Sequence, residues 1–314
     1  MKPNKIAILV NLDARQGKSA KTWKKIYSSV VEVFPENTEI ITFKPPCDFD
    51  ALLKELYNDK GVDGFISAGG DGSLNYMINV LLNLVDNTSR PVYVGAIALG
   101  SSNDFHKPHT SYIMGVPVKV NWDNCQLSDV GKITYQDAKG DLNTRYFIIN
   151  AGIGITAEAN YRFNHPKSIL KFLKRNWVDA AIFFAAVKTI FLYRNYQAEL
   201  LIDNEINESI VLSNLSVIKN PNISGSFRYE QNIVFNDGFL GLNYCDDMNK
   251  FELLRTLIGL VKGRFKTNAK RKTYKLKDLK VSFNEPRPVE ADGEVFVTKH
   301  CSFSVIPKAI YIMK

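Results

Sequence analysis

The feature that most constrains this chain is a glycine-rich turn that lies between an apolar run and an amphipathic segment. The run Val62–Ile66 predicts a buried strand, and it leads into the turn Gly69-Gly70-Asp71-Gly72-Ser73. Three glycines within four positions let a ligand approach the backbone, where the N–H groups of the turn and the positive end of a following helix face one point. That helix is expected because apolar residues recur three and four positions apart, at Leu74, Met77, Ile78, Leu81, Leu82 and Val85. Strand, turn and helix together predict a phosphate-binding site.

Asp71 is the unusual member of this turn, because a carboxylate repels phosphate. It suits such a site if it holds Mg²⁺, orients a lysine or accepts a proton from an attacking hydroxyl. The alternative interpretation is a tight turn with an aspartate near a helix N-cap. The turn alone leaves these two interpretations about even, and the motifs further along the chain favour the functional one.

Length and composition indicate a folded protein of two domains. The chain has 314 residues, 45% of them hydrophobic, and a net charge of +8. The positive charge fits nucleic acid, an anionic membrane or a polyphosphate substrate. We expect no nucleic-acid partner, because the sequence shows no basic sheet face with aromatic stacking residues. No zinc site or disulfide framework is expected, and a reducing compartment is indicated, because no CxxC pair occurs among Cys47, Cys125, Cys245 and Cys301.

Neither a leader peptide nor a transmembrane segment is expected. The first apolar run, Ile6–Val10, is too short for the core of a signal peptide. The most apolar segment, Asn176–Val187, contains Asp179 and falls short of the roughly 20 residues that a membrane span needs. We therefore expect a cytoplasmic protein that meets a membrane only from its inner surface.

The first 128 residues predict an α/β domain with a parallel, Rossmann-like sheet. Amphipathic helices are expected around Trp23–Phe34 and Phe49–Tyr57, between the strands of βαβ units. Ligands of such sheets bind at the carboxyl ends of the strands, where the loops 11–19, 67–73 and 99–107 should converge. The expected strands are Ile6–Val10, Glu39–Phe43, Val62–Ile66 and Pro91–Leu99.

The remainder of the chain predicts an antiparallel β-sandwich, because short strands follow one another without intervening helices. We expect a domain over 129–303, with the segment 304–314 available to complete the first domain. Helices are expected at about 168–193 and at Phe251–Val261. The expected strands are Gln197–Ile202, Ser209–Ile218, Ile233–Phe235, Phe239–Tyr244, Thr273–Leu276, Lys280–Phe283, Val295–Val297 and Phe303–Val305.

Two further motifs complete a pattern that resembles a known family. Gly100-Ser101-Ser102-Asn103-Asp104-Phe105 follows the glycine turn by about thirty residues, and Asp292-Gly293-Glu294 lies near the C-terminus. In this order and spacing the motifs resemble the bacterial diacylglycerol kinase-type lipid kinases, which are related to sphingosine kinases and NAD kinases. The resemblance covers nearly the whole chain and includes Asn11, Gly17-Lys18, Asp129-Val130-Gly131, Asn150–Gly152 and Asn236–Phe239.

The resemblance implies an N-terminal domain that binds ATP, a C-terminal sandwich that binds lipid, and an active site in the cleft between them. The implied reaction is transfer of the γ-phosphoryl group to a lipid hydroxyl, with diacylglycerol as first acceptor and phosphatidic acid as product. Alternatives are a sphingoid base, phosphatidylglycerol or a soluble hydroxyl acceptor such as NAD, and a catalytically silent regulator that binds nucleotide or lipid. The implied partner is a lipid at an anionic membrane surface, and a homodimer is left open.

The resemblance also implies roles for individual residues. Asp292 is the implied general base, oriented by Glu294, and Asp71 serves Mg²⁺ and phosphate positioning, although related kinases give the base role to the aspartate of the glycine turn. One of Lys167 and Lys171 corresponds to a family lysine near the phosphates. The implied nucleotide-binding residues are Asn11, Lys18, Gly69, Gly70, Gly72, Ser73, Gly100, Ser101, Ser102, Asn103 and Lys107.

Two cation roles follow from the same resemblance. Asp129 corresponds to an aspartate that supports the water network of Mg²⁺. Asp237 corresponds to the carboxylate of a second, structural cation site, which backbone carbonyls near Val234 and Phe239 complete.

The chain departs from the family pattern at several places. Serine replaces threonine at Ser73 and Ser101, and the loop 11–18 is longer and lacks a proline, which weakens the match of Lys18. Lys107 lies where an arginine is common. The segment 224–232 has lost most of a glycine-rich stretch on the lipid side, so the acceptor stays open.

Three features also have ordinary structural interpretations. Asp292-Gly293 on its own is typical of a hairpin turn. The basic run 262–277 is either a solvated surface or a site for anionic headgroups, and the two weigh about equally. The aromatic cluster Trp177, Phe183, Phe184 and Phe191 is predicted to lie in the core rather than in a lipid pocket.

Overall fold

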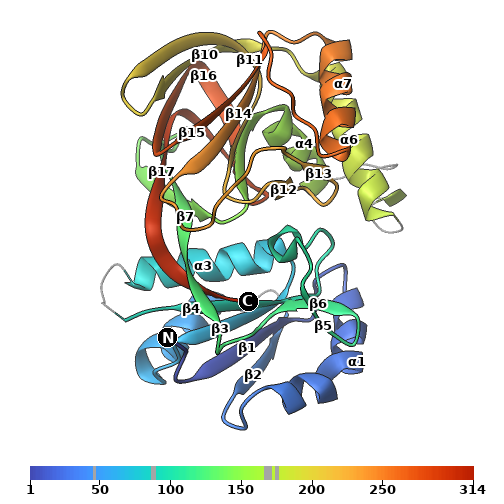
Figure 1. The fold of residues 1–314 in the computed structure, drawn as a ribbon, viewed down its shortest axis with the longest axis vertical. Helices are drawn as coiled ribbons and strands as arrows, with labels where there is room; N and C mark the ends of the chain where they lie inside the picture. Colours follow the sequence, from blue (N-terminus) through green and yellow to red (C-terminus); the bar gives the residue numbers. More distant parts are fainter. Residues whose placement is uncertain (45–46, 86–89, 166–171, 174–176) are drawn as a thin grey trace. The chain divides into compact units, whose positions relative to one another are not determined.

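The computed structural model describes residues 1–44, 47–85, 90–165, 172–173 and 177–314 (Figure 1). The chain divides into two compact units. The first contains Met1–Ser128 together with Lys308–Lys314, and the second contains Asp129–Pro307. Each unit is described separately below.

The first unit contains a sheet whose central strands are parallel. Their order is β2 (Glu39–Phe43), β1 (Ile6–Asn11), β3 (Gly64–Gly69) and β4 (Tyr93–Ala98). The end of β17 (Glu294–Met313) adds a further parallel strand, because Tyr311 pairs with Tyr93 of β4. In the described part of the chain, the fifteen-stranded network to which these strands belong is mostly antiparallel. The expectation of a parallel, Rossmann-like sheet therefore describes only this part of the chain.

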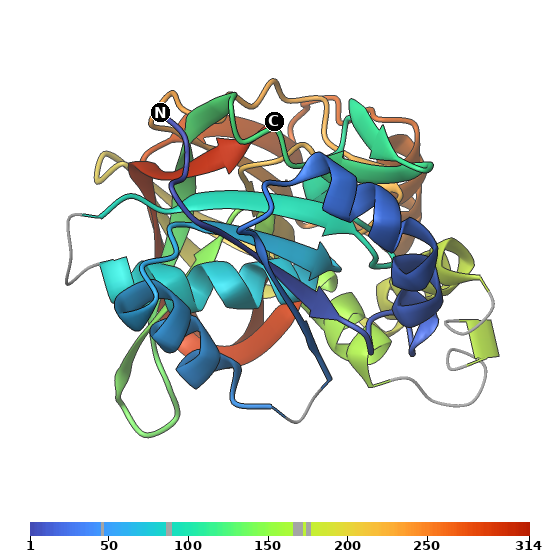
Figure 2. The ribbon, with the colours of Figure 1, turned by 90° about the horizontal axis from the view of Figure 1, so that it is seen from below.

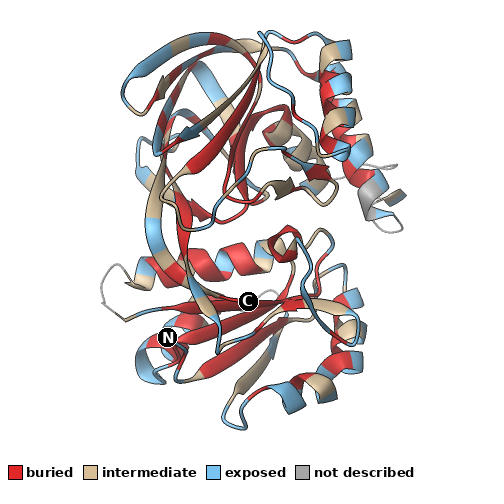
Figure 3. Ribbon diagram, viewed as in Figure 1, coloured by how far each residue is buried: buried red, intermediate tan, exposed pale blue. Residues whose placement is uncertain are grey.

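Helices cover both faces of these parallel strands (Figure 2). Helix α1 (Lys18–Val33) packs Trp23, Ile26 and Val30 onto one face, and α3 (Asp71–Val85) lies on the other face beside α2 (Phe49–Lys54). The helix expected to reach Tyr57 ends as a π-helical turn over Glu55–Asp59. Strands β1, β3 and β4 are buried along almost their whole length (Figure 3), as a sheet covered on both faces requires.

A hairpin that the sequence did not predict completes the first unit. Strands β5 (Ser111–Ile113) and β6 (Val116–Lys119) pair with each other, and β6 runs antiparallel to the end of β4. These strands are short, with three and four residues, and only Ile113 and Val118 are buried. So short an apolar pattern carries no clear period, which explains why it was missed.

The second unit is built from antiparallel strands. In its main path the strands follow the order β15, β14, β11, β10, β16 and β17, while β9 pairs with both β11 and β16. Strand β7 pairs with β8, and β12 with β13. The strand bounds are β7 Cys125–Gln136, β8 Leu142–Phe147, β9 Asn150–Gly154, β10 Tyr196–Ile202, β11 Ile206–Ile218, β12 Asn222–Ile223, β13 Phe227–Arg228, β14 Leu240–Asp246, β15 Arg271–Leu276 and β16 Asp278–Ala291.

Three helices are described in the second unit: α4 (Ile155–Asn164), α6 (Val178–Leu192) and α7 (Lys250–Val261). Helix α4 was not predicted, because it buries only Ile155 and Ala157 and so has almost no apolar period. Part of the segment expected to begin a helix near 168 lies outside the described residues.

Two strand predictions for the second unit were wrong. Residues 233–235 form no strand, because this apolar stretch belongs to the loop before β14. The separate strands expected at 295–297 and 303–305 are one continuous strand, β17. Within the described part of the chain, no helix is both long and apolar enough to cross a membrane.

Candidate functional site

The glycine turn and the loop 99–107 meet at the carboxyl ends of adjacent parallel strands. Gly69, the last residue of β3, pairs with Ala98, the last residue of β4. The backbones of the two loops then touch: a Cβ atom added to Gly100 would lie 2.2 Å from the Cα of Gly70. No side chain fits at this contact, which gives Gly100 a structural requirement independent of any ligand.

Asp71 fastens the two loops together. Its Oδ2 accepts a hydrogen bond from the N–H of Asp104 at 3.0 Å, and its Oδ1 accepts one from the N–H of Phe105 at 3.2 Å. These N–H groups open the short 3₁₀ turn Asp104–His106, so the carboxylate of Asp71 caps that turn from the neighbouring loop. Asp71 is thus a positioning residue in this structure, whatever else it does when a ligand is bound.

Asn103 closes its own loop. Its Oδ1 accepts the N–H of Gly100 at 3.0 Å, and its Nδ2 donates to the carbonyl of Gly100 at 3.0 Å. The residue has the left-handed φ of 50°, which asparagine tolerates better than most side chains. Ser101 and Ser102 occupy the turn between these two residues, so the SSN motif shapes a tight loop at the strand end.

The loop after β1 joins the same edge of the sheet. Asn11 donates from Nδ2 to the hydroxyl of Ser73 at 2.9 Å, which connects β1 to the first turn of α3. Lys18 is exposed at the start of α1, directly after Gly17. The ammonium of Lys107 pairs with Asp104 at 2.8 Å, so this predicted nucleotide ligand is held inside its own loop.

Gly72 has no structural requirement comparable with that of Gly100. It is exposed, its φ is not positive, and a Cβ added there would meet nothing within 4 Å. It lies in the first turn of α3, where N–H groups have no partner within the helix. Open space at this position is what a phosphate cradle needs, because a side chain would occupy the approach of the anion.

Asp292 lies in the second unit, where it is held by backbone donors. It forms a two-residue hairpin turn with Gly293 between β16 and β17, and the φ values are 45° and 94°. Its carboxylate accepts the N–H groups of Ile148 at 2.9 Å, Ile149 at 3.1 Å and Asn150 at 2.8 Å. Asp292 therefore belongs to a hairpin turn, as the ordinary interpretation of Asp292-Gly293 predicts. Its carboxylate is also buried and is oriented by hydrogen bonds.

Glu290 lies two residues before Asp292, and the sequence motifs did not indicate it; we call these two residues the carboxylate cluster. Its side chain is fully buried and accepts hydrogen bonds from the N–H of Gly293 at 2.9 Å and from the side chain of Asn150. Burial, together with the nearby charge of Asp292, raises the pKa of Glu290 to about 8 against the opposing effect of the hydrogen bonds that it accepts. A glutamate inside the apolar strand end Val289–Ala291 was the available signal, because charged residues are rarely buried without a partner.

This raised pKa predicts a specific dependence of stability on pH. The folded protein keeps the proton of Glu290 up to about pH 8, whereas the unfolded chain loses it near 4.5. Stability from this group is thus complete below the unfolded pKa and falls as pH rises through that window, by an amount on the order of a few kcal/mol.

We expect Glu290→Gln to remove this dependence, because glutamine stays neutral. The melting temperature of the variant relative to wild type should rise steadily from pH 5 to pH 8, by about 5 °C or more in total. Calorimetry at several pH values measures the difference. A constant offset between the two proteins would contradict a protonated Glu290 in the folded state.

Glu294 does not join the carboxylate cluster. It begins β17, is exposed, and among the described residues has no hydrogen bond or ion pair with Asp292. Its predicted orienting role therefore has no supporting contact here; the contacts to Asp292 come from the backbone of 148–150 instead.

Asp129, predicted to support the Mg²⁺ water network, and the residues predicted to hold a structural cation converge on the ammonium group of a lysine. Lys219 Nζ lies 2.8 Å from Oδ2 of Asp129 and 2.8 Å from the carbonyl oxygens of both Val234 and Phe239. Oδ1 of Asp237 is 3.6 Å away. The ammonium occupies the place of the expected ion, so these residues do not fit a bound metal.

Mg²⁺ therefore has one candidate ligand from the prediction, Asp71. In the part of the chain that the structure describes, no three His, Cys, Asp or Glu side chains gather as a metal site would require. A single carboxylate fits Mg²⁺ that arrives with a nucleotide, because this ion is commonly held by one or two carboxylates and the phosphates themselves. Lys167 and Lys171 lie outside the described residues.

The basic run and the aromatic cluster differ from expectation. Three of the lysines in 262–277 form ion pairs: Lys270 with Glu252, Lys272 with Glu208 and Lys275 with Asp237. Three further basic residues of this run, Lys262, Arg264 and Lys266, are exposed and follow directly after α7. The prediction of a core position was wrong for Trp177, Phe183 and Phe191, which are exposed.

Each of the two parts of the chain matches a known protein family. The family described as "Diacylglycerol kinase catalytic domain" matches residues 5–121. The family described as "YegS C-terminal NAD kinase beta sandwich-like domain" matches residues 151–314, slightly more than half of the chain.

Individual relatives agree with these matches. The chain is 25% identical to the diacylglycerol kinase of Bacillus subtilis over 247 residues, which cover 78% of this chain and 73% of the relative. It is 22% identical over 255 residues to a Shewanella frigidimarina protein named "Probable lipid kinase YegS-like", with coverage of 78% and 74%. A crystal structure of a diacylglycerol kinase from Bacillus anthracis has a TM-score of 0.69 at 17% identity, covers 100% of this chain and 97% of the other, and shows that the fold is shared.

Proposed function

This chain belongs to the family of bacterial diacylglycerol kinases and YegS-like lipid kinases, and we propose that it transfers the γ-phosphoryl group of ATP to a lipid hydroxyl. Kinase membership implies ATP as the donor. Diacylglycerol, which would give phosphatidic acid, is the acceptor we place first. Because the segment 224–232 departs from the family pattern on the lipid side, the alternative acceptors are a sphingoid base, phosphatidylglycerol and a soluble hydroxyl compound. The test below distinguishes them.

The observation that carries this proposal is the joined pair of loops at the ends of β3 and β4. Gly70 and Gly100 touch through their backbones, and Asp71 ties the first loop to the second through two N–H groups. Beside them, Gly72 leaves open space at the first turn of a fifteen-residue helix. Backbone N–H groups with no side chain in front of them, at the positive end of a helix, are what a polyphosphate binds.

Phosphoryl transfer asks the protein for positioning and charge stabilisation rather than covalent chemistry. In our proposal the first turn of α3 holds the phosphates, and Asn11 keeps Ser73 at that turn through their hydrogen bond. Asp71, the first residue of α3, would contribute a carboxylate oxygen to Mg²⁺ that arrives with the nucleotide. When bound, Mg²⁺ supplies positive charge to the phosphate oxygens.

Asp292 is the proposed acceptor of the proton from the lipid hydroxyl. Three backbone N–H groups fix the direction of its carboxylate, and Glu290 lies two residues earlier, near the end of β16. A carboxylate that is oriented in this way can receive a proton as the hydroxyl attacks phosphorus. Asp71 is the competing candidate, and the two are separated by the variants described in the Discussion.

The exposed side chains of α6 and α7 support access to a membrane surface. The two helices contact each other and expose Phe183, Phe191, Phe251 and Ile258, of which Phe251 is 84% exposed. Basic residues follow α7, as on surfaces that bind anionic headgroups beside apolar side chains. We propose that this surface, which we call the α6–α7 surface, lies against the leaflet that contains the substrate.

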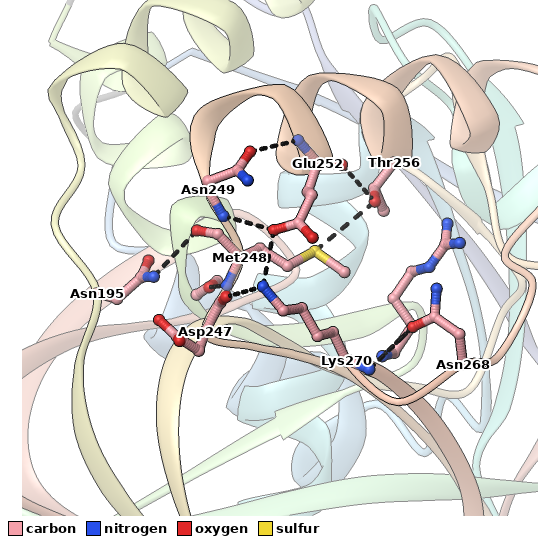
Figure 4. A network of polar contacts seen from close by, with 10 residues as sticks. Asn195, Asp247, Met248, Asn249, Glu252, Thr256, Asn268 and Lys270 are labelled. Carbon is pink, nitrogen blue, oxygen red and sulfur yellow. Dashed lines mark hydrogen bonds and ion pairs between the residues drawn. The ribbon is translucent and has the colours of Figure 1, made fainter.

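A network of polar contacts holds the start of α7 (Figure 4). Phe251, which is exposed, is the second residue of this helix. Asn249 accepts the N–H of Glu252 at 3.0 Å, and Glu252 accepts the N–H of Asn249 at 2.8 Å, which forms a capping box. Lys270 joins this cap by an ion pair of 3.0 Å to Glu252 and by a hydrogen bond of 2.7 Å to the carbonyl of Asp247. An aromatic side chain that is presented from so fixed a turn suits insertion into a membrane interface.

The proposal is tested by incubation of the purified protein with Mg-ATP, NAD, a sugar and vesicles that contain diacylglycerol, a sphingoid base or phosphatidylglycerol. Mass spectrometry of the products should show a lipid phosphate. Vesicles with anionic lipid should be better substrates than neutral ones if the α6–α7 surface docks as proposed. A phosphorylated sugar or dinucleotide in place of lipid would overturn the acceptor class, and nucleotide binding without any product would favour a silent regulator.

A further inference from the structure

Lys219 is a fully buried ammonium group with a complete set of oxygen partners. Its side chain is 1% exposed, and the residue directly follows Ile218, the last residue of β11. Nζ donates at 2.8 Å to each of three acceptors: Oδ2 of Asp129 and the carbonyl oxygens of Val234 and Phe239. An ammonium has three N–H donors, so its hydrogen-bonding capacity is matched by these contacts.

The acceptors come from two segments that the ammonium holds together. Asp129 belongs to β7, and the two carbonyls lie at opposite ends of the loop 234–239, which contains no strand or helix. Asp129 also accepts the N–H of Gly238 at 2.8 Å, and its own N–H donates to the carbonyl of Phe235 at 2.7 Å. The irregular loop is therefore wrapped around the charged end of Lys219.

The oxygen set around Lys219 is one that a hard metal ion would also accept. Two carboxylates and two backbone carbonyls converge, since Oδ1 of Asp237 lies 3.6 Å from Nζ. Oxygen atoms of these kinds are the protein ligands of Ca²⁺ and Mg²⁺. A metal ion cannot enter while the ammonium is present, because three of the oxygens are in direct contact with Nζ and the two cations would repel each other.

Asp237 is held in its charged form from both sides. Burial opposes its ionisation, but the hydrogen bond from Lys275 and the charge of Lys219 outweigh burial and lower the pKa of Asp237. Lys275 approaches to 2.7 Å from the solvent side, and its side chain is 53% exposed. The loop thus has one internal cation and one external cation on the same carboxylate.

We propose that the Lys219 ammonium is the structural cation of the loop 234–239, and that it replaces a metal ion, so that removal of the side chain opens an oxygen-lined site for a divalent cation. The inference does not rest on the proposed kinase activity. It concerns the stability of one loop in the second unit, and it can be tested without nucleotide or lipid.

The test compares three proteins by thermal unfolding in nucleotide-free buffer, each with EDTA and with Ca²⁺, Mg²⁺ or Mn²⁺. Wild type should unfold at the same temperature in every buffer. Lys219→Ala leaves space for an ion, and Lys219→Met fills that space with an uncharged chain of similar length. In EDTA both variants should lose about 10 °C, because each leaves buried carboxylate charge without its partner.

Divalent ions should then separate the two variants. We expect Lys219→Ala to recover about 5 °C or more at a saturating concentration of one of these ions, and Lys219→Met to recover nothing. Lys275→Met is the matched control: it removes a positive charge from the same Asp237 but leaves Lys219 in place, so ions should not stabilise it.

Two results would overturn the proposal. One is a wild-type protein whose unfolding temperature falls by several degrees in EDTA. The same conclusion would follow if elemental analysis found a stoichiometric metal ion in wild type that is absent from Asp237→Asn. The other is a Lys219→Ala protein that folds but responds to divalent ions no more than Lys219→Met does. If neither Lys219 variant folds even with added ions, wild-type metal content and EDTA sensitivity decide, since a metal-free and insensitive wild type supports the internal cation.

Discussion

Asp292→Asn should lower kcat by a factor of about 10²–10⁴ while the protein stays folded. Asparagine tolerates the left-handed φ of 45° at this turn, so the hairpin between β16 and β17 can persist. What is lost is the carboxylate that would accept the proton of the lipid hydroxyl. Lipid phosphate formation under saturating Mg-ATP measures the effect, and calorimetry checks the fold.

Asp203→Asn is a matched control for this change. Asp203 also has a left-handed φ, of 49°, in a hairpin turn, and its carboxylate accepts two backbone N–H groups at 2.8 Å. Both variants should stay folded, but only the change at Asp292 should affect turnover. If Asp292→Asn keeps near-normal kcat and Asp71→Asn loses activity by the stated factor, the base role moves to Asp71; near-normal activity in both removes both from proton transfer.

The second large effect is expected from alanine at Gly72, which should strongly weaken nucleotide binding without loss of stability. A Cβ at this position meets no protein atom within 4 Å, and alanine favours the helix that begins here. The same methyl group would occupy the approach of the phosphates to the first turn of α3. Titration calorimetry with Mg-ATP should show an affinity at least about 100-fold weaker, the cost of displacing a phosphate from close backbone contact.

Gly100→Ala separates this ligand effect from damage to the fold. Its Cβ would lie 2.2 Å from the Cα of Gly70, so the two loops must move apart, and we expect lower thermal stability as well as lost binding. Unchanged nucleotide affinity in a well-folded Gly72→Ala protein would contradict the assignment of this turn to the phosphates.

The parallel strands and the meeting of their loops were predictable because they follow from local patterns. The apolar period after Ser73 identifies α3, and alternation of strands with helices dictates that Gly69 and Ala98 end at one edge. The touching of Gly70 and Gly100 is then a consequence of topology, and the clusters of small residues were a sufficient signal for it.

The surroundings of Asp292 could not be predicted in the same way. Its three hydrogen-bond donors lie more than 140 positions earlier in the chain, and backbone N–H groups have no sequence signature. The burial of Glu290 depends on the same distant contacts. A sequence motif identifies the functional side chain, but it does not identify the distant backbone groups that orient that side chain.

Lys219 shows why the cation site was predicted incorrectly. A lysine directly after the apolar strand 209–218 is typical of a solvated strand end, and nothing local indicates that its side chain turns inward. Residues that were named for two different cation roles lie together, and the chain itself supplies the positive charge that they surround.

Strand β17 has a consequence for how this protein is made. It leaves the turn of Asp292 and ends beside β4, where Tyr311 stacks on Tyr93 with 4.7 Å between ring centroids. The first unit is therefore incomplete when residues 1–128 have emerged from the ribosome, because the start of β4 gains its second neighbour only with residues 308–314. Newly made chains would leave the start of β4, at Tyr93 and Val94, unpaired on this side throughout synthesis of the second unit, whereas β6 already pairs with the end of β4. A cut after residue 307 would therefore remove a strand from the first unit, although the cut lies at the far end of the sequence.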